Sequence, residues 1–249
     1  MFTFRIFQTR CGQLSGLFDE IGVPSDGPDV FNNSNFVFGY NYRRRIPDWV
    51  AEHLTPQRLV GPGRRKLSRY RSDSRIWAPS YKSDYKRSGY SRGHMSSAAN
   101  NAISQAAVNE SFLLSNVVPQ DAQNNAGYWN IFEGYTRDLA TRFYDVYVIS
   151  GPLFLPVQTN GKTFIVYEVI GRNQVAVPTH LFKLIAVRNA TSPVKSSTQS
   201  ANSVSEQQTF AIGCFVVPNQ AVKLSKPLSR FQVTLPRLER LSGSCCVLI

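Results

Sequence analysis

The sequence feature that most restricts the fold is a set of four short segments rich in Val, Ile and Phe, each bounded by Gly or Pro. They span residues 146–150, 163–170, 181–188 and 209–217. Segments of this length and composition are typical of β-strands, so we predict that all four belong to one sheet. The chain has no window of about 18 uninterrupted apolar residues, which excludes a membrane-spanning helix.

Further elements follow from local patterns. We predict strands at 35–42 and 229–235, helices at 101–113 and 125–142, and a helical turn near Leu238. Residues 47–54 fit a short strand and a short helix equally well. Residues 189–207 are rich in Ser, Thr, Asn and Gln and predict a surface loop. Strands and helices without a regular βα period indicate an α+β fold.

Positive charge is concentrated in one part of the chain. The 249 residues carry a net charge of +12, and residues 43–92 hold fourteen Lys and Arg against four acidic residues. Residues 56–92 lack an element pattern, and a loop of that length is usually functional. The alternatives for this stretch are a nucleic-acid surface, a solvated basic face and an acidic membrane surface. The basic residues that we single out are Arg64, Arg65, Lys66, Arg69 and Arg71.

Two groups of residues have the chemistry of phosphodiester hydrolysis. His94 follows Arg92 and Gly93 at the end of the basic stretch, which puts a general base beside a bidentate phosphate donor. Asn125 and Glu133 lie on one face of the helix predicted at 125–142, where their oxygens suit a hydrated Mg²⁺. Taken alone, a buried structural histidine and a capping asparagine explain these residues more simply.

The sequence lacks the residues that a zinc site, a phosphate-binding loop or a nucleophilic serine motif would require. Cys11, Cys214, Cys245 and Cys246 have no CxxC spacing and no neighbouring histidine pair, so structural zinc is not expected. Cys214 is predicted to be a core residue of a strand. Neither a GxxxxGK[ST] motif nor a GxSxG motif is present.

Several segments match one known family in order and spacing. They include WVAEHL (49–54), SGYSRGHMSSAANN (88–101), NNAGYWNIFE (124–133), VAVPTHLFK (175–183) and FQVTLPRLERLSG (231–243). They resemble the DNA/RNA non-specific endonucleases with a ββα-metal active site, the group of mitochondrial endonuclease G, and within it the exonuclease-G-like branch. The resemblance implies a nuclease domain over residues 18–243, with a central, mostly antiparallel sheet flanked by helices.

The resemblance also implies roles. His94 would deprotonate the attacking water, Arg92 would contact the scissile phosphate, and Asn125 would bind a single Mg²⁺ directly, with Mn²⁺ as a substitute. Glu133 would orient the waters of the ion, and Asn101 and Asn116 would support the site. The implied partners are DNA, RNA and a second copy of the chain, and the implied compartment is the mitochondrion.

The chain departs from the family pattern at several positions. Ser91 replaces the Asp common in the wider family, as in the exonuclease-G-like branch, and Ala102 replaces a Lys of that branch. The branch has a helical C-terminal wing, whereas this sequence stops at Ile249, which favours endonuclease action. Residues 1–17 fit a targeting segment or a disordered N-terminus. The tail at 244–249 ends in a Cys-a-a-X pattern, although we expect a truncated or variant core end and no lipid anchor.

The sequence thus supports one leading function and two alternatives. We expect a Mg²⁺-dependent, sugar-non-specific nuclease that hydrolyses DNA and RNA. The alternatives are a 5′-exonuclease of mitochondrial DNA processing and a non-catalytic nucleic-acid-binding paralogue.

Overall fold

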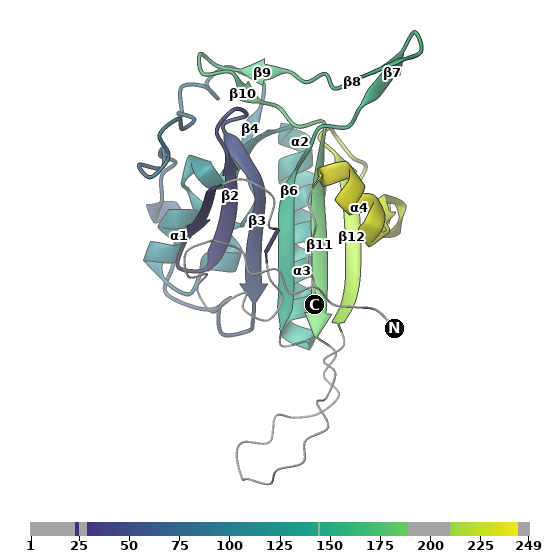
Figure 1. The fold of residues 1–249 in the computed structure, drawn as a ribbon. Helices are drawn as coiled ribbons and strands as arrows, with labels where there is room; N and C mark the ends of the chain where they lie inside the picture. Colours follow the sequence, from purple (N-terminus) through teal and green to yellow (C-terminus); the bar gives the residue numbers. More distant parts are fainter. Residues whose placement is uncertain (1–22, 25–28, 144, 189–209, 244–249) are drawn as a thin grey trace, which may run out of the picture.

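A seven-stranded antiparallel sheet forms the centre of the molecule (Figure 1). The computed structural model describes residues 23–24, 29–143, 145–188 and 210–243. The strands, in spatial order, are β1 (Asp29–Asn32), β2 (Phe36–Asn41), β3 (Ile46–Leu54), β6 (Val146–Leu153), β11 (His180–Arg188), β12 (Phe210–Pro218) and β13 (Gln232–Val233). Sheet and helices together confirm the predicted α+β fold.

The two faces of the sheet carry separate hydrophobic cores. Because side chains alternate along a strand, Val148 and Leu181 face one side, and Ile149 and Phe182 face the other. Helix α3 (Asn130–Arg142) covers the first face, and helix α4 (Leu235–Ser242) covers the second (Figure 1). The candidate site described below lies on the α3 side.

Three of the four apolar segments form neighbouring strands of this sheet, namely β6, β11 and β12. The prediction that segment 163–170 belongs to the central sheet is wrong. This segment holds β8 (Lys162–Phe164) and β9 (Val169–Ile170), which pair with β7 (Val157–Thr159) and β10 (Val175–Ala176) in two small sheets. The side chains of β7 and β8 are exposed on a protruding hairpin, so their apolar composition does not reflect burial in the core (Figure 1).

The remaining strand predictions have mixed outcomes. The strand at 35–42 is β2, and the undecided segment 47–54 belongs to β3. The strand predicted at 229–235 is largely wrong, because residues Leu228–Phe231 form a 3-10 turn and only β13 pairs with β12. The helical turn near Leu238 is confirmed as part of α4.

The helices begin at different residues from those predicted. Helix α1 (Gln105–Ser111) is shorter than 101–113, because the Ser104 hydroxyl caps it by accepting a hydrogen bond from the Ala107 amide at 3.1 Å. The helix predicted at 125–142 exists, but it starts earlier, with α2 (Ala122–Asn124). Its residues Asn125–Trp129 form a π-helical segment, η4, before α3 begins.

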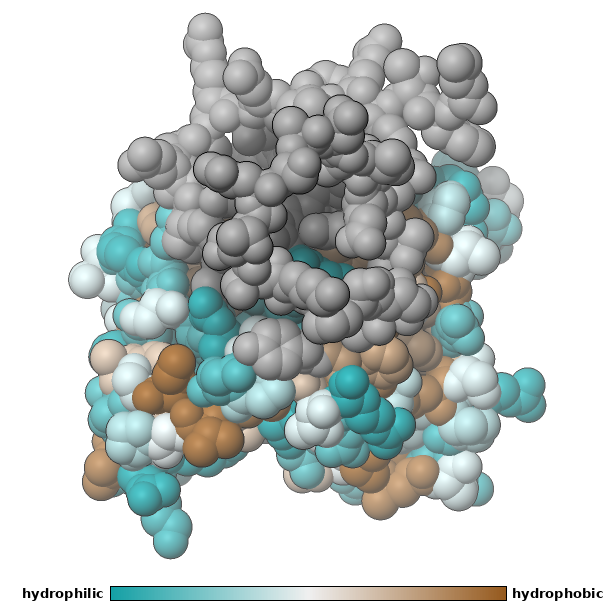
Figure 2. All heavy atoms as spheres, turned by 90° about the horizontal axis from the view of Figure 1, so that it is seen from below, coloured by the Kyte–Doolittle hydropathy of each residue, from teal (hydrophilic) through white to brown (hydrophobic). Residues whose placement is uncertain are grey.

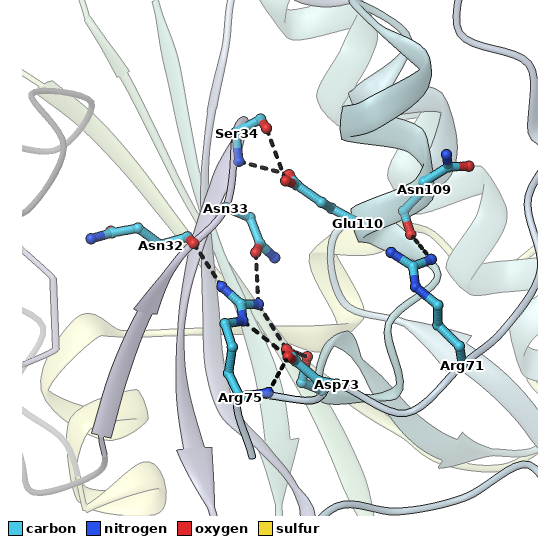
Figure 3. A network of polar contacts seen from close by, with 9 residues as sticks. Asn32, Asn33, Ser34, Arg71, Asp73, Arg75, Asn109 and Glu110 are labelled. Atoms are coloured by element: carbon cyan, nitrogen blue, oxygen red, sulfur yellow. Dashed lines mark hydrogen bonds and ion pairs between the residues drawn. The ribbon is translucent and has the colours of Figure 1, made fainter.

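The basic stretch 56–92 is a loop for most of its length, as predicted, with one short 3-10 helix, η1 (Arg65–Leu67). Polar contacts fix it to the rest of the molecule (Figure 3). Arg75 donates to both carboxylate oxygens of Asp73, at 2.9 and 2.7 Å, and to the side chain of Asn33 at 2.8 Å. Arg71 donates to the Asn109 carbonyl of α1 at 2.8 Å. The loop is therefore held in one conformation although it has little secondary structure.

A smaller antiparallel pair supports the candidate site. Strand β4 (Ser91–His94) pairs with β5 (Val117–Gln120), and the chain then enters α2, η4 and α3, which gives a ββα unit. Glycine is required at position 93 because the backbone there approaches Gln120 closely. A Cβ atom at Gly93 would lie 2.0 Å from Oε1 of Gln120.

Several remaining predictions concern surface and termini. No helix among the described residues is long and apolar enough to cross a membrane. Hydrophilic and hydrophobic residues are interspersed over the described part of the underside (Figure 2). Cys214 is buried in β12, as predicted. The predictions for 1–17, 189–207 and 244–249 lie outside the described residues.

Candidate active site

His94 ends strand β4 in an aromatic enclosure. Its side chain is 6% exposed and packs against Tyr70 and Phe112, with ring centroids 5.3 and 4.9 Å away. Burial and the nearby charge of Arg65 lower the pKa of His94 to about 3. The imidazole is therefore neutral near pH 7, which is the form that can accept a proton.

Hydrogen bonds of Tyr70 define which nitrogen of His94 accepts that proton. The Tyr70 hydroxyl donates to the Arg92 carbonyl at 3.1 Å and lies 3.3 Å from Nδ1 of His94. The Tyr70 hydroxyl has a single proton, and it donates this proton to the Arg92 carbonyl. In its contact with His94 the hydroxyl oxygen must therefore be the acceptor, so Nδ1 of His94 carries a proton. Nε2 then holds the free lone pair, and it is buried without a partner among the described residues.

Two arginines lie over the aromatic rings that enclose this histidine. The Arg92 guanidinium lies 4.7 Å from the centre of the Tyr70 ring, and that of Arg65 lies 5.8 Å from the Phe112 ring. Burial raises the pKa of Tyr70, the charges of Arg65 and Arg92 lower it, and that of Glu133 raises it. Arg65, Arg92 and Glu133 therefore converge on the same aromatic enclosure.

Asn125 lies at the start of η4 and is oriented by Ser91. The Ser91 hydroxyl donates to the Gln120 carbonyl at 2.8 Å, so it must accept from the Nδ2 group of Asn125, 3.0 Å away. With this assignment, the Oδ1 oxygen of Asn125 makes no hydrogen bond to Ser91. Ser91 thus aligns the amide of the one residue that we expect to bind a metal directly.

Glu133 lies in the first turn of α3, above a buried charge cluster. Burial and the neighbouring carboxylate of Glu52 raise the pKa of Glu133 to about 7, although Lys183 and Arg137 oppose the shift. Lys183 is 1% exposed, donates to the Ser150 hydroxyl at 2.7 Å and lies 4.3 Å from the centre of the Trp129 ring. Trp129, which lies between Asn125 and Glu133 along the chain, is packed into the core.

Asn101 and Asn116 lie beneath the site and meet at Ser96. Asn116 accepts from the Ser96 amide and donates to the Ser96 and Ser111 carbonyls, each at 2.8 Å. Asn101 donates to the Ser96 hydroxyl at 2.7 Å, which in turn donates to Glu52 at 2.7 Å. Both amides therefore hold Ser96, which lies just after the end of β4 and bonds to Glu52.

The five predicted basic residues lie in η1 or close to it along the chain. Arg64, Arg65, Lys66, Arg69 and Arg71 are all exposed. Arg69 donates to the Lys66 carbonyl at 2.9 Å, and Arg71 is tied to α1, so these two have fixed directions. Of these five residues, only Arg65 shifts the pKa values of His94 and Glu133 through its charge.

The sequence did not reveal the roles of four residues in this arrangement: Tyr70, Phe112, Glu52 and Lys183. Tyr70 is one of several aromatic residues in the basic loop, and no local motif distinguishes it from the others. Lys183 and Glu52 lie on strands β11 and β3, far from the site along the chain. No local pattern marks them, because only the pairing of these strands with β6 brings them beneath α3.

The fold and the arrangement around β4, β5 and η4 place the chain among the ββα-metal nucleases. A solved structure described as the EndoG/EndoGI complex superimposes with a TM-score of 0.83 at 35% identity, covering 94% of this chain and 92% of that chain. The chain belongs to the DNA/RNA non-specific endonuclease family, which matches residues 15–247. Nucleases of this type are metal-dependent.

Curated relatives include both mitochondrial and fungal nucleases. Human "Nuclease EXOG, mitochondrial" is 42% identical over 228 residues, which are 90% of this chain and 58% of that protein. Human "Endonuclease G, mitochondrial" is 39% identical over 215 residues, 85% of this chain and 67% of that protein. "Nuclease C1" of Cunninghamella echinulata var. echinulata is 37% identical over 230 residues, 90% of this chain and 84% of that protein. The chain thus spans less than two thirds of the length of human EXOG.

Proposed function

We propose that this chain is a Mg²⁺-dependent, sugar-non-specific nuclease that hydrolyses phosphodiester bonds of DNA and RNA. The observation that carries the proposal is the neutral His94, whose free Nε2 lies in an enclosure flanked by Arg65 and Arg92. A base without an internal partner beside two cations suits proton abstraction next to a bound phosphate. The family membership supports the same conclusion.

In the proposed reaction, Nε2 of His94 takes a proton from water as the water oxygen attacks phosphorus. The bond from phosphorus to the leaving sugar oxygen breaks, and that oxygen takes a proton from solvent. The pKa of about 3 belongs to the site without nucleic acid. A phosphate bound at Arg92 raises the pKa of His94, since negative charge favours the imidazolium form. Arg92 stabilises the charge that develops on the phosphate oxygens.

Asn125 and Glu133 fit the requirements of a hydrated Mg²⁺. Ser91 leaves the amide oxygen of Asn125 available, and no group of three His, Cys, Asp or Glu able to hold a metal occurs among the described residues. A cation here would take most of its ligands from water and phosphate, a habit of Mg²⁺ that Mn²⁺ can share. Such an ion supplies positive charge to the transition state. Glu133 would accept hydrogen bonds from its waters, and Asn101 and Asn116 would support the site from below.

The exposed cations Arg64, Lys66, Arg69 and Arg71 extend from Arg65 and would form a track for the phosphate backbone. Contacts to phosphates carry no sequence information, which agrees with a non-specific nuclease.

Plasmid nicking tests the proposal. We expect supercoiled DNA to be nicked with Mg²⁺ and to stay intact in EDTA, and we expect His94→Ala to bind DNA without nicking it. His180→Ala is the matched control, because His180 lies at the start of β11 on the opposite face of the sheet. Failure of the wild type to nick under any metal condition, with DNA binding retained, favours the non-catalytic paralogue.

Substrate ends decide between the two catalytic modes. An endonuclease cuts circular DNA and end-blocked linear DNA alike, whereas the alternative 5′-exonuclease needs a free end. We propose the endonuclease mode.

The compartment and assembly belong to the same proposal. The names of the human relatives support a mitochondrial location, which imaging of a tagged chain tests. A homodimer rests on the family resemblance, and light scattering tests it.

A further inference from the structure

Trp77 is held at the surface by the residues on either side of it. Its side chain is 79% exposed, whereas Ile76 and Ala78 are 3% and 8% exposed. Ile76 belongs to the core on the α3 side of the sheet. The buried neighbours anchor the loop, so the indole cannot turn inward without displacing them.

One face of the indole is already occupied. The Trp77 ring stacks on Tyr42 with centroids 4.9 Å apart and an angle of 19° between the planes. Tyr42 packs edge-on against the buried Tyr40 at 5.4 Å, and its hydroxyl donates to Asp29 at 2.8 Å. The Trp77–Tyr42 platform is therefore rigid, and it leaves the large exposed part of the indole to solvent.

The surroundings of the platform are basic. Arg43 directly follows Tyr42 and is exposed. Lys82 is exposed on the same loop as Trp77. Asp29 contacts the platform, and one of its carboxylate oxygens accepts the hydrogen bond of the Tyr42 hydroxyl. An aromatic face beside cations is the arrangement that binds single-stranded nucleic acid, by stacking of bases and contacts to phosphates.

The platform and the active site lie on the same side of the sheet. Tyr40 neighbours the buried Tyr85, whose pKa is raised by burial and by Tyr40 and lowered by Arg92. Tyr40 and Tyr85 thus connect the platform with Arg92 through one hydrophobic core. We expect a strand bound at Arg92 to extend along this side of the sheet toward Trp77.

We propose that Trp77 is a base-stacking subsite for an unpaired nucleotide of the nucleic acid, remote from the scissile phosphate. This inference rests on the proposed function for its ligand class. It goes further, because it gives the chain a preference for single-stranded or frayed substrate that phosphate contacts alone do not produce. Duplex ends and loops would bind better than continuous duplex.

Tryptophan fluorescence reports on this subsite directly. The chain has three tryptophans, and Trp49 and Trp129 are 1% and 0% exposed. In EDTA, which prevents cleavage, we expect a single-stranded oligo-dT to quench the emission. An abasic oligonucleotide of equal length should bind by its phosphates without quenching.

Variants at Trp77 complete the test, with anisotropy of labelled oligonucleotides as the readout. We expect Trp77→Ala to bind oligo-dT about tenfold more weakly, the size of one lost stacking contact. Its binding of the abasic strand should stay unchanged, and Trp77→Phe should retain most of the affinity. Leu224→Ala, which removes another exposed apolar side chain, is the control and should change neither affinity.

Two results would overturn the subsite: no quenching of the wild type by oligo-dT, or equal affinity of wild type and Trp77→Ala for it. Plasmid nicking in Mg²⁺ keeps this question separate from the proposed function. We expect both wild type and Trp77→Ala to nick supercoiled plasmid, because the substitution leaves His94, Arg92 and Asn125 in place. If neither protein nicks but the base-dependent quenching is present, the nuclease proposal fails and the stacking subsite stands.

Discussion

Replacing Glu133 by Gln should stabilise the protein at alkaline pH while it removes cleavage activity. Glu133 is held among Glu52, Lys183 and Arg137, and burial raises its pKa from 4.5 to about 7. Because this folded-state pKa lies above the unfolded value, the folded protein binds more protons between these two pH values. The free energy of unfolding must therefore fall as pH rises from 4.5 toward 7.

The size of the effect follows from the shift. Each pKa unit corresponds to about 1.4 kcal/mol, which gives about 3 kcal/mol for Glu133, and its partial contact with solvent reduces this to about 2 kcal/mol. Glu133→Gln cannot ionise, so at about pH 8 we expect it to be more stable than the wild type by about 2 kcal/mol. At about pH 5 the two proteins should agree within about 0.5 kcal/mol, since Glu133 is then protonated in the fold.

Urea unfolding, followed by tryptophan fluorescence in EDTA at several pH values, measures this difference. Asp138→Asn is the matched control, because Asp138 is exposed on the same helix, and it should keep the pH slope of the wild type. The reasoning is refuted if Glu133→Gln shows the wild-type slope, or if it is destabilised equally at both ends of the pH range.

Two further substitutions test the geometry around His94. Tyr70→Phe removes the hydroxyl that selects the tautomer of His94. We therefore expect the cleavage rate of the bound complex to fall about tenfold, while DNA affinity and thermal stability stay unchanged. A wild-type cleavage rate would show that Tyr70 contributes only packing. Gly93→Ala places a methyl group against Gln120 and should lower stability by about 1–3 kcal/mol in chemical denaturation. Gly134→Ala is its control: the added methyl meets only ordinary contacts, and the helix should gain up to about 1 kcal/mol. A neutral Gly93→Ala would contradict the close packing of β4 on β5.

The sequence predicted those parts of the molecule that depend on local pattern. Strands β6, β11 and β12 follow from runs of β-branched residues, and the long basic loop follows from its lack of any period. Segment 163–170 has the same composition as a core strand, yet it lies in two small sheets and is mostly exposed, with Ile170 buried, because composition does not determine which strand it pairs with. Pairing depends on the whole sheet.

The candidate site divides in the same way. His94, Arg92 and Asn125 follow from short motifs, whereas the contacts that set their chemistry come from distant segments. Tyr70 reaches His94 from the basic loop, and Lys183 acts on Glu133 from strand β11. The π-helical turn at Asn125 was not predicted either. A spacing of four residues, as between Asn125, Trp129 and Glu133, does not distinguish a π-helical turn from an α-helical one.

The central claim is that His94 acts as the base of phosphodiester hydrolysis, and single-turnover cleavage tests it most directly. The rate constant of a labelled oligonucleotide duplex is measured in Mg²⁺ with enzyme in excess, at concentrations where wild type, His94→Ala and His180→Ala bind all of the DNA. We predict a fall of about 10²–10⁴-fold for His94→Ala and none for His180→Ala. A rate for His94→Ala within threefold of the wild type would contradict the account.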